Sequence, residues 1–356
     1  MSDIRNRSAA FCDRHRLRVP ILLAPMAGAC PPSLSIAVAN AGGLGACGAL
    51  LMQPAEIAAW VAEMRAHSTG AFQLNLWIPD PQPVRDADHE ARVRAFLATW
   101  GPPVPPEAAD ARPADFAAQF EAVCASKPPI VSSVMGLYPP DFVTQLKARG
   151  IAWFANVSTI AESKAAEAAG ADAVVVQGME AGGHRGCFDA RVAEMQQVGL
   201  FALLPAVVDA VRLPVVATGG IADPRGVAAA FTLGASAVQI GTGFLRCPEA
   251  KIHPAWAQAL AQTPPEGTML TRAFSGRAGR SIATQYVRAA ADASAPNPAP
   301  YPVQRGLTAA MRQAAQQSGD VQRMQAWAGQ SAAMARAEPA AYVVANLWRG
   351  AQQLLP

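Results

Sequence analysis

Short runs of apolar residues recur along the chain. Most of these runs lack the alternation of apolar and polar positions that indicates a strand with one solvent-exposed face. Continuous apolar runs suit parallel strands that are covered on both faces. Alanine-rich stretches of helical character, such as PAEIAAWVAEMRAH and PRGVAAAFTLG, separate these runs. The pattern predicts strands at residues 21–25, 44–48, 72–77, 130–135, 152–157, 173–178, 214–220 and 237–243.

Repetition of a strand followed by a helix predicts an α/β fold, specifically a TIM (β/α)8 barrel. An open doubly wound sheet is the alternative that the same alternation allows. Two segments of the chain resemble each other, which supports successive βα units. Residues 158–178 and 223–243 each contain a helical stretch, the pattern G-A-x-A-V, a strand and a glycine, in this order.

Two regions fall outside the predicted βα units. A proline-rich insertion at about residues 79–129 carries two expected helices, at 83–99 and 113–125. A tail follows the last unit and contains a proline-rich loop and further amphipathic helical stretches. We therefore expect a barrel domain over residues 1–265 and a C-terminal extension over residues 266–356 that caps the barrel mouth.

Composition and charge restrict the expected partners. The chain of 356 residues has a formal net charge of +3 and no cluster of Lys and Arg, so nucleic acid is not an expected partner. Its 6 cysteines are widely spaced without a CxxC pair, which is typical of reduced cysteines in a cytoplasmic protein. The N-terminus lacks the apolar region of a secretory signal. Glycines interrupt the most hydrophobic segment, residues 34–51, which argues against a membrane-spanning helix. We expect a cytoplasmic monomer or homodimer that does not bind a membrane.

The carboxyl ends of the strands form the active face of a TIM barrel, so the residues there are the candidates for chemistry. TGG (218–220) and GTG (241–243) end the last two strands, where glycine N–H groups approach an anion closely. The pattern predicts a phosphate cradle, although the same glycines also suit simple tight turns. Asn75 and Gln177 bring neutral amides to this rim, which suit either the polar edge of a flavin or base, or a satisfied position in the core.

A single imidazole follows the sixth strand, in QGMEAGGHRG (177–186). Imidazole exchanges a proton near neutral pH, so His184 is a candidate general base, while a structural histidine is the plainer interpretation. Glu180 lies in the same turn, which either presents it to the site or points it away. Cys187 is a candidate nucleophile without a visible activating group. The sequence has no HExxH motif or two-His-one-carboxylate spacing, so we expect no metal site.

The order and spacing of APMAG, FQLNLW, QGMEAGGHRG, PVVATGGIAD and GASAVQIGTGFL resemble the FMN-dependent nitronate monooxygenases, formerly called 2-nitropropane dioxygenases. The resemblance runs from about residue 18 to residue 285 and implies a TIM barrel that holds FMN non-covalently. It is shared more loosely with flavin enoyl-acyl-carrier-protein reductases and NADH:quinone reductases. The family's flavin contacts fall on Met26, Asn75, Gln177, Gly182, Gly183, Gly220, Gln239, Ile240, Gly241 and Thr242.

The resemblance also implies a reaction. The family's substrates are alkyl nitronates such as propionate 3-nitronate, and FMN-dependent oxidation with O2 yields a carbonyl product and nitrite. The catalytic histidine of the family falls on His184. For a substrate that carries a carboxylate, Arg277, Arg280 or Arg305 would supply a charged partner. The other segments that resemble the family's substrate pocket contain Ser275 and Tyr301.

Two other functions stay open on the sequence alone. One is an NAD(P)H-dependent quinone or enoyl-thioester reductase of the same flavin barrel superfamily. The sequence lacks a G-x-G-x-x-G fingerprint, but such barrels bind nicotinamide without one. The other is a non-catalytic barrel that acts as a binding protein, which the intact histidine and glycine turns disfavour.

Overall fold

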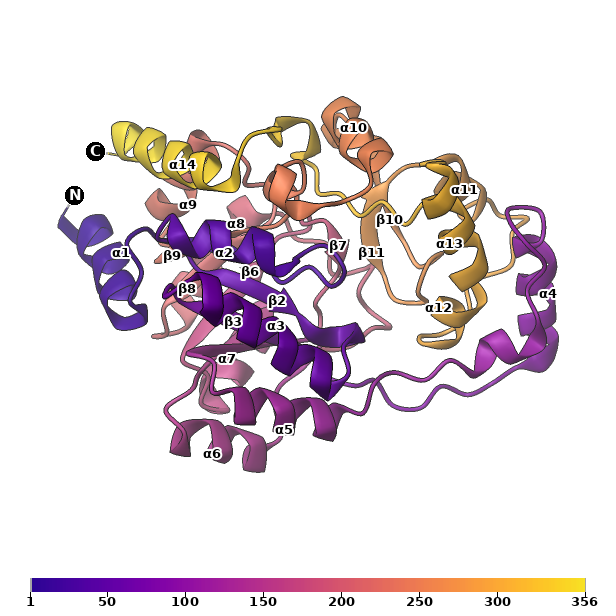
Figure 1. Ribbon diagram of the computed structural model, residues 1–356, viewed down its shortest axis with the longest axis horizontal. Helices are drawn as coiled ribbons and strands as arrows, with labels where there is room; N and C mark the ends of the chain where they lie inside the picture. Colours follow the sequence, from indigo (N-terminus) through magenta and orange to yellow (C-terminus); the bar gives the residue numbers. More distant parts are fainter. Residues whose placement is uncertain (1, 356) are drawn as a thin grey trace.

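Parallel strands close into a barrel with helices on the outside in the computed structural model, which describes residues 2–355 (Figure 1). The strands are hydrogen-bonded in the order β1-β9-β8-β6-β5-β4-β3-β2, and a parallel bridge between Leu22 and Leu44 joins the two ends of this 8-stranded sheet. The predicted TIM barrel is confirmed, and this bridge excludes an open doubly wound sheet. The barrel strands are β1 (Ile21–Leu23), β2 (Gly45–Gly48), β3 (Phe72–Trp77), β4 (Ile130–Val134), β5 (Ala152–Val157), β6 (Ala173–Gln177), β8 (Val215–Thr218) and β9 (Ala237–Ile240).

The helices of the outer layer begin at sequence features that favour a helix start. Thr159 accepts a hydrogen bond from the Glu162 N–H, and Asp223 accepts one from the Gly226 N–H, so both act as side-chain caps. Proline occupies the first turn of several others, where it loses no hydrogen bond. The outer helices are α2 (Pro32–Asn40), α3 (Pro54–His67), α5 (Phe116–Ser126), α6 (Pro140–Ala148), α7 (Ile160–Ala168), α8 (Leu200–Ala210), α9 (Pro224–Thr232) and α14 (Ala340–Leu354).

The last helix, α14, completes the outer layer by packing against α9 and α2 (Figure 1). The chain after residue 265 therefore returns to the barrel after it has crossed the mouth. The domain division at residues 265 and 266 stays a prediction, and α14 contributes its apolar face to the core of the barrel through Val344 and Leu347.

The N-terminal helix α1 (Ser2–His15) packs on the amino end of the barrel. Its Phe11 joins Leu22 and Phe154 from the strands in one buried cluster. His15 lies against the same rings, with centroids 4.7 Å from Phe11 and 5.0 Å from Phe154, and burial lowers its pKa to about 4. Apolar side chains fill the interior of the barrel at this end. A cavity beside them is lined by polar residues that include His15, Lys147 and Asp172.

The insertion and the tail share a second core. Val93 and Leu97, from the insertion, pack with Phe274, Tyr286 and Leu307 from the tail. Figure 1 shows the result, with α4 beside α12 and α13 although the two segments are far apart in sequence. The elements of these regions are α4 (Ala87–Leu97), η2 (Pro106–Asp110), α10 (Pro254–Gln262), η5 (Pro265–Gly267), β10 (Thr268–Thr271), β11 (Gly279–Ile282), α11 (Gln285–Ala289), α12 (Val303–Leu307), α13 (Ala309–Ser318) and η6 (Ala332–Met334).

The two helices expected in the insertion have different partners. The first, α4, packs on the tail, whereas the second, α5, packs on α3 and covers β3 as a barrel helix. The proline-rich insertion is therefore an extension within the third βα unit. The three remaining short helices follow strands β2 and β9: η1 (Ala49–Leu51), η3 (Thr242–Phe244) and η4 (Pro248–Ala250).

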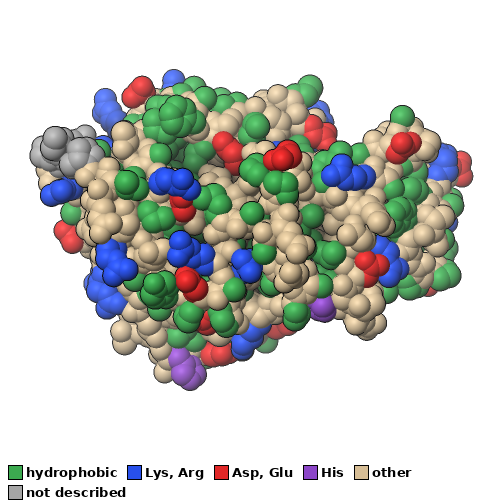
Figure 2. Space-filling view, turned by 90° about the horizontal axis from the view of Figure 1, so that it is seen from above, with side chains coloured by type: hydrophobic (Ala, Val, Ile, Leu, Met, Phe, Trp, Pro, Cys, Tyr) green, Lys and Arg blue, Asp and Glu red, His purple; other side chains and the backbone are tan. Residues whose placement is uncertain are grey.

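The surface carries charges of both signs. On the face shown in Figure 2, basic and acidic side chains are interspersed among apolar and neutral ones. Between residues 2 and 355, no helix combines the length and the hydropathy needed to cross a membrane.

Candidate active site

A cavity of about 400 Å³ opens at the carboxyl ends of the barrel strands. This volume falls within the range of small-molecule sites. Two groups of residues in its wall differ in origin. The glycine end consists of Gly219, Gly220 and Gly241, which follow β8 and β9. The tail end consists of His184, Trp77, Trp327, Arg305 and Arg312, of which the last three come from the tail.

The glycine end offers backbone donors that the protein itself does not use. Among residues 2–355, the N–H groups of Gly219, Gly220 and Gly241 have no hydrogen-bond acceptor. Gly219 and Gly220 adopt φ values of +113° and +69°, which favour glycine over other residues. Unpaired N–H groups in a cavity wall are suited to an anion such as a phosphate.

Three side-chain amides that were predicted to contact a flavin line the cavity, and they differ in which of their polar atoms already have a hydrogen-bond partner. Asn75 donates through Nδ2 to the Ser132 hydroxyl at 3.0 Å and to the Ser132 carbonyl at 3.2 Å, so its own carbonyl oxygen remains for a ligand. Gln239 accepts through Oε1 from Gln73 Nε2 at 3.0 Å. Gln177 accepts from the Gly186 N–H at 2.7 Å and donates to the His184 carbonyl at 3.0 Å. Gln177 thus fixes the turn that carries His184, a role that the sequence did not indicate.

The two glycines before His184 let the chain pass close to the tail. A Cβ on Gly182 would lie 2.5 Å from the Gly329 nitrogen and 2.8 Å from the Thr242 hydroxyl, too close for any side chain. Gly183 has a φ of +77° and begins β7 (Gly183–His184), which pairs with β11 in a small antiparallel sheet. The glycines therefore place the imidazole between the barrel and the tail. Gly182 lines the cavity, and Gly183 is not among the lining residues.

Two indole rings and a hydroxyl surround the His184 imidazole. Its ring centroid lies 4.7 Å from that of Trp77 and 4.9 Å from that of Trp327, and its Nε2 lies 2.8 Å from the Ser275 hydroxyl oxygen. Burial first, and then the charges of Arg277 and Arg305, lower the pKa of His184 to about 3. The imidazole is therefore neutral at pH 7, so it carries one N–H donor and one acceptor nitrogen.

Arg277 and Tyr301 lie behind the cavity wall and support Trp77. Arg277 is 3% exposed, its Nη2 lies 3.1 Å from Asp80 Oδ1, and its guanidinium carbon lies 5.7 Å from the centre of the Trp77 ring. The Tyr301 ring stacks on Trp77 at 5.2 Å with an interplanar angle of 14°. Neither these two nor Ser275 are among the lining residues, so their predicted substrate roles would act through Trp77 and His184.

Two other polar residues of this region have structural partners. The Glu180 carboxylate accepts from the Leu200 N–H at 2.8 and 3.1 Å, so it caps the amino end of α8. Cys187 is 1% exposed, and burial raises the pKa of its thiol. A thiol that stays protonated is a poor nucleophile, so the geometry favours neither residue for catalysis.

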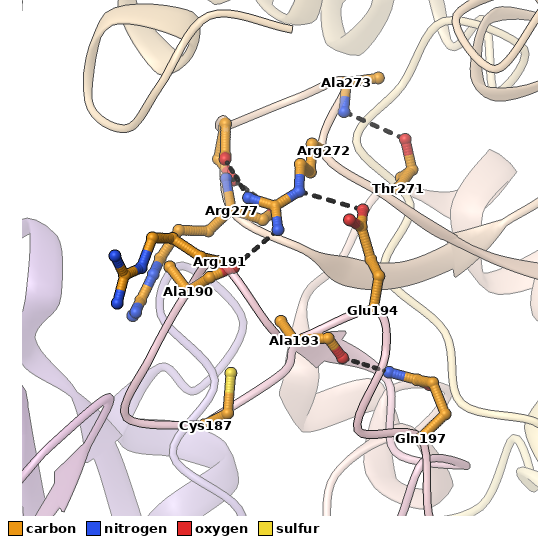
Figure 3. Close-up of polar contacts among 12 residues, drawn as sticks. Cys187, Ala190, Arg191, Ala193, Glu194, Gln197, Thr271, Arg272, Ala273 and Arg277 are labelled. Carbon is orange, nitrogen blue, oxygen red and sulfur yellow. Dashed lines mark hydrogen bonds and ion pairs between the residues drawn. The ribbon is translucent and has the colours of Figure 1, made fainter. Parts of the chain in front are cut away.

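Figure 3 shows how the loop after His184 is fastened to the tail by Arg272. The Arg272 guanidinium lies 3.0 Å from the Glu194 carboxylate and donates to the Ala190 carbonyl at 2.6 Å. It also donates to the Gly276 carbonyl at 3.3 Å. Because Gly276 follows Ser275, one side chain holds both the loop and the hydroxyl that faces His184.

Sequence reasoning missed three residues of the tail end. Trp77 is the last residue of β3, and its position at a strand end was the available signal. Trp327 lies in a loop without periodicity, and Arg312 lies on the short helix α13, so neither carries a signal of its own. Of the three arginines suggested for a substrate carboxylate, only Arg305 lines the cavity of the described chain.

Comparison with known proteins decides the family. Residues 9–350 match the family model described as nitronate monooxygenase. A nitronate monooxygenase from Paraburkholderia phytofirmans is 40% identical over 344 residues, which cover 94% of this chain and 92% of that protein. The chain belongs to the nitronate monooxygenase family.

Solved structures agree with the family assignment. A nitroalkane oxidase from Streptomyces ansochromogenes is 33% identical with a TM-score of 0.87, covering 97% of this chain and 98% of that one. FabK from Thermotoga maritima is 28% identical with a TM-score of 0.77, covering 97% and 96%. As a member of the nitronate monooxygenase family, the protein is a flavin-dependent oxidoreductase.

The residues of the cavity fit a flavin. Unpaired N–H groups at the glycine end match the needs of a phosphate, and the free carbonyl oxygen of Asn75 matches a ring N–H. Met26, Ile240 and Thr242 add to the same wall. The Thr242 hydroxyl accepts from the Gly329 N–H at 3.0 Å, so this part of the wall is also tied to the tail.

Proposed function

We propose that this nitronate monooxygenase family member binds FMN and oxidises alkyl nitronates, represented by propionate 3-nitronate, with O2 to a carbonyl product and nitrite. The observation that carries the proposal is the neutral imidazole of His184, held between two indole rings in the wall of the same cavity as the unpaired glycine N–H groups. A cytoplasmic location, and a monomeric or dimeric state, stay predictions.

FMN is the flavin that the glycine end favours, because a single phosphate suits one compact set of donors. Gly220 and the run from Gln239 to Thr242 would hold this phosphate, while Met26, Asn75, Gln177 and Gly182 would surround the rest of the cofactor. Gly183, which lies outside the cavity wall, would act by placing His184. The cofactor supplies the electron transfer from the nitronate and the reaction with O2.

His184 would bind the nitronate as a hydrogen-bond donor. Because its pKa is lowered to about 3, the imidazole is a weak base for removing a proton from a neutral nitroalkane at pH 7. Its N–H group suits an oxygen of the already ionised nitronate. The Ser275 hydroxyl, whose oxygen lies 2.8 Å from Nε2, would donate to Nε2, which would leave the imidazole proton on Nδ1 and fix the orientation of the ring. Trp77 and Trp327 would keep water away from this contact.

Anaerobic mixing tests the proposal. The purified yellow protein is mixed with propionate 3-nitronate, and separately with NADPH, while the flavin absorption band is recorded. We expect the nitronate to bleach the band rapidly, and we expect nitrite to form once O2 is admitted. The proposal is wrong if the nitronate leaves the band unchanged and no nitrite appears.

A reductase is the second candidate, and the similarity to FabK is the observation that favours it. Rapid bleaching by NADPH, with no response to the nitronate, would support this candidate. Protein that is colourless and cannot be reconstituted with FMN would support a non-catalytic barrel instead.

A further inference from the structure

The Arg305 guanidinium is a half-buried cation without a countercharge. It lines the cavity, and among residues 2–355 its side chain makes neither a hydrogen bond nor an ion pair. Burial lowers the pKa of Arg305, and within residues 2–355 the group that acts in the opposite direction is Tyr301, which is neutral at pH 7. A charge in this position is costly unless something pairs with it.

The neighbouring arginines differ from Arg305 in this respect. Arg277 pairs with Asp80 at 3.1 Å, outside the cavity wall. Arg280 donates to the Met179 carbonyl at 2.9 Å and to the Thr268 hydroxyl at 3.1 Å. Arg277 therefore has a carboxylate as countercharge, although its Nη1 and Nη2 make no hydrogen bond, and Arg280 has two hydrogen-bond acceptors. Among residues 2–355, the Arg305 side chain has neither kind of partner and lines the cavity.

Arg312 holds Arg305 in place and adds a second positive charge. It donates through Nη2 to the Arg305 carbonyl at 2.9 Å and through Nε to the Thr308 hydroxyl at 3.1 Å. Both acceptors are neutral, and burial followed by the charge of Arg305 lowers the pKa of Arg312 to about 10. Two cations thus line the tail end, and among residues 2–355 neither of them forms an ion pair with a carboxylate.

The charge of Arg305 acts on His184, the residue proposed to bind the nitronate group. This charge is one of the causes of the lowered pKa of His184, and it also acts on Tyr301. Trp77, beside His184, has a buried indole N–H with no hydrogen-bond partner among the described residues. The tail end therefore holds more unpaired donors than the two oxygens of one nitronate group need.

We propose that Arg305 is a specificity-determining residue that binds a carboxylate on the nitronate substrate. This inference rests on the proposed function and names the residue that would recognise the carboxylate of propionate 3-nitronate. A guanidinium pairs with a carboxylate through two parallel hydrogen bonds, which a methyl group in the same place cannot replace.

Equilibrium binding tests the inference without turnover. Calorimetric titration of the holoenzyme compares 3-nitropropionate with 1-nitropropane, in which a methyl group replaces the carboxylate. We expect the wild type to bind 3-nitropropionate roughly 10–100-fold more tightly, the usual value of one hydrogen-bonded charge. Arg305→Gln is expected to remove this preference, and Arg305→Lys to retain part of it. Arg288→Gln, a change at an exposed arginine of α11, is the matched control.

Turnover separates this inference from the proposed function. The ratio of kcat/KM for propionate 3-nitronate over propyl 1-nitronate is expected to fall roughly 10–100-fold in Arg305→Gln, mainly through KM. If both nitronates are oxidised equally well and Arg305→Gln changes neither, the inference is wrong and the proposed function stands. If neither is oxidised, the proposed function fails, and the calorimetric preference still decides the role of Arg305. Arg305→Met replaces Arg305→Gln if the latter loses its flavin or its cooperative thermal unfolding.

Discussion

The glycine end and the tail end of the cavity are built by different means. The glycine end presents backbone N–H groups from the turns after β8 and β9, so its donors come from the barrel, and the tail contacts it through the Ser331 hydroxyl, which donates to the Gly220 carbonyl. The tail end brings together side chains from β3, from the turn after β6 and from the tail. The first arrangement suits any ligand with a phosphate, whereas the second, on the proposed function, would select the molecule that reacts. We therefore expect cofactor binding and substrate choice to be separable by mutation.

Loss of the imidazole should give the largest effect on turnover. We expect His184→Asn to lower kcat about 10²–10³-fold, the usual cost of losing one donor aimed at charge in the reacting group. The flavin content should stay unchanged, because no part of the glycine end moves. Nitrite formation and the ratio of flavin absorbance to protein absorbance measure the two quantities. The exposed His67→Asn variant is the control, and loss of flavin from His184→Asn would contradict the separation of the two ends.

Adding a side chain at the glycine end should weaken flavin binding, whereas loss of the imidazole should leave the flavin content unchanged. Gly241 has a φ of −107°, which other residues tolerate, but its Cβ would lie 3.3 Å from both Ala24 Cβ and Met26 Sδ. Gly241→Leu should fold and bind flavin about 100-fold more weakly, which corresponds to the loss of one or two charged hydrogen bonds. Flavin fluorescence during dialysis measures this. The control is Gly226→Ala on α9, where the nearest atoms are 3.6 Å away. Yellow Gly241→Leu protein would place the phosphate elsewhere.

The sequence predicted the glycine end better than the tail end for a physical reason. Strand ends and glycines are properties of the local chain, so the runs 218–220 and 241–243 could be assigned to the barrel mouth directly. The choice among arginines depended on partners far away in sequence. Arg277 is paired with Asp80, which belongs to the proline-rich insertion. No pattern in the sequence predicts this contact. Trp327 reaches the site only because the tail crosses the mouth before α14 returns to the barrel.

Removal of the hydroxyl beside His184 should give a smaller effect than removal of the imidazole. Ser275→Ala deletes the contact at 2.8 Å from Nε2 and leaves the ring held by Trp77 and Trp327. One neutral hydrogen bond contributes about 0.5–1.5 kcal/mol, so kcat should fall about 2–10-fold. Ser275→Thr should restore most of the activity, because it keeps the hydroxyl. Equal activity in Ser275→Ala and the wild type would show that the ring needs no fixed tautomer.

Acid titration of His184 should give the smallest change within the working pH range, and it sharpens the comparison most. With a pKa of about 3, the imidazole stays neutral between pH 5 and pH 8, so turnover of a preformed nitronate should show no step that follows this residue. Below the ordinary value near 6.5, the unfolded chain takes up a proton that the folded chain refuses, so stability should decrease as the pH falls toward 3.

His15, with a pKa of about 4, contributes to this acid destabilisation with the same sign from the opposite end of the barrel. The two histidines differ in their response to Arg305, whose charge acts on His184 alone of the two. Arg305→Gln should therefore raise the His184 midpoint in an NMR titration of the imidazole, yet leave it below 6.5 because burial is the larger cause. The His15 midpoint should not move. A titration midpoint near 6.5 for His184 in the wild type would mean that water reaches the tail end. The tail end would then lack the water-excluded surface that substrate selection requires.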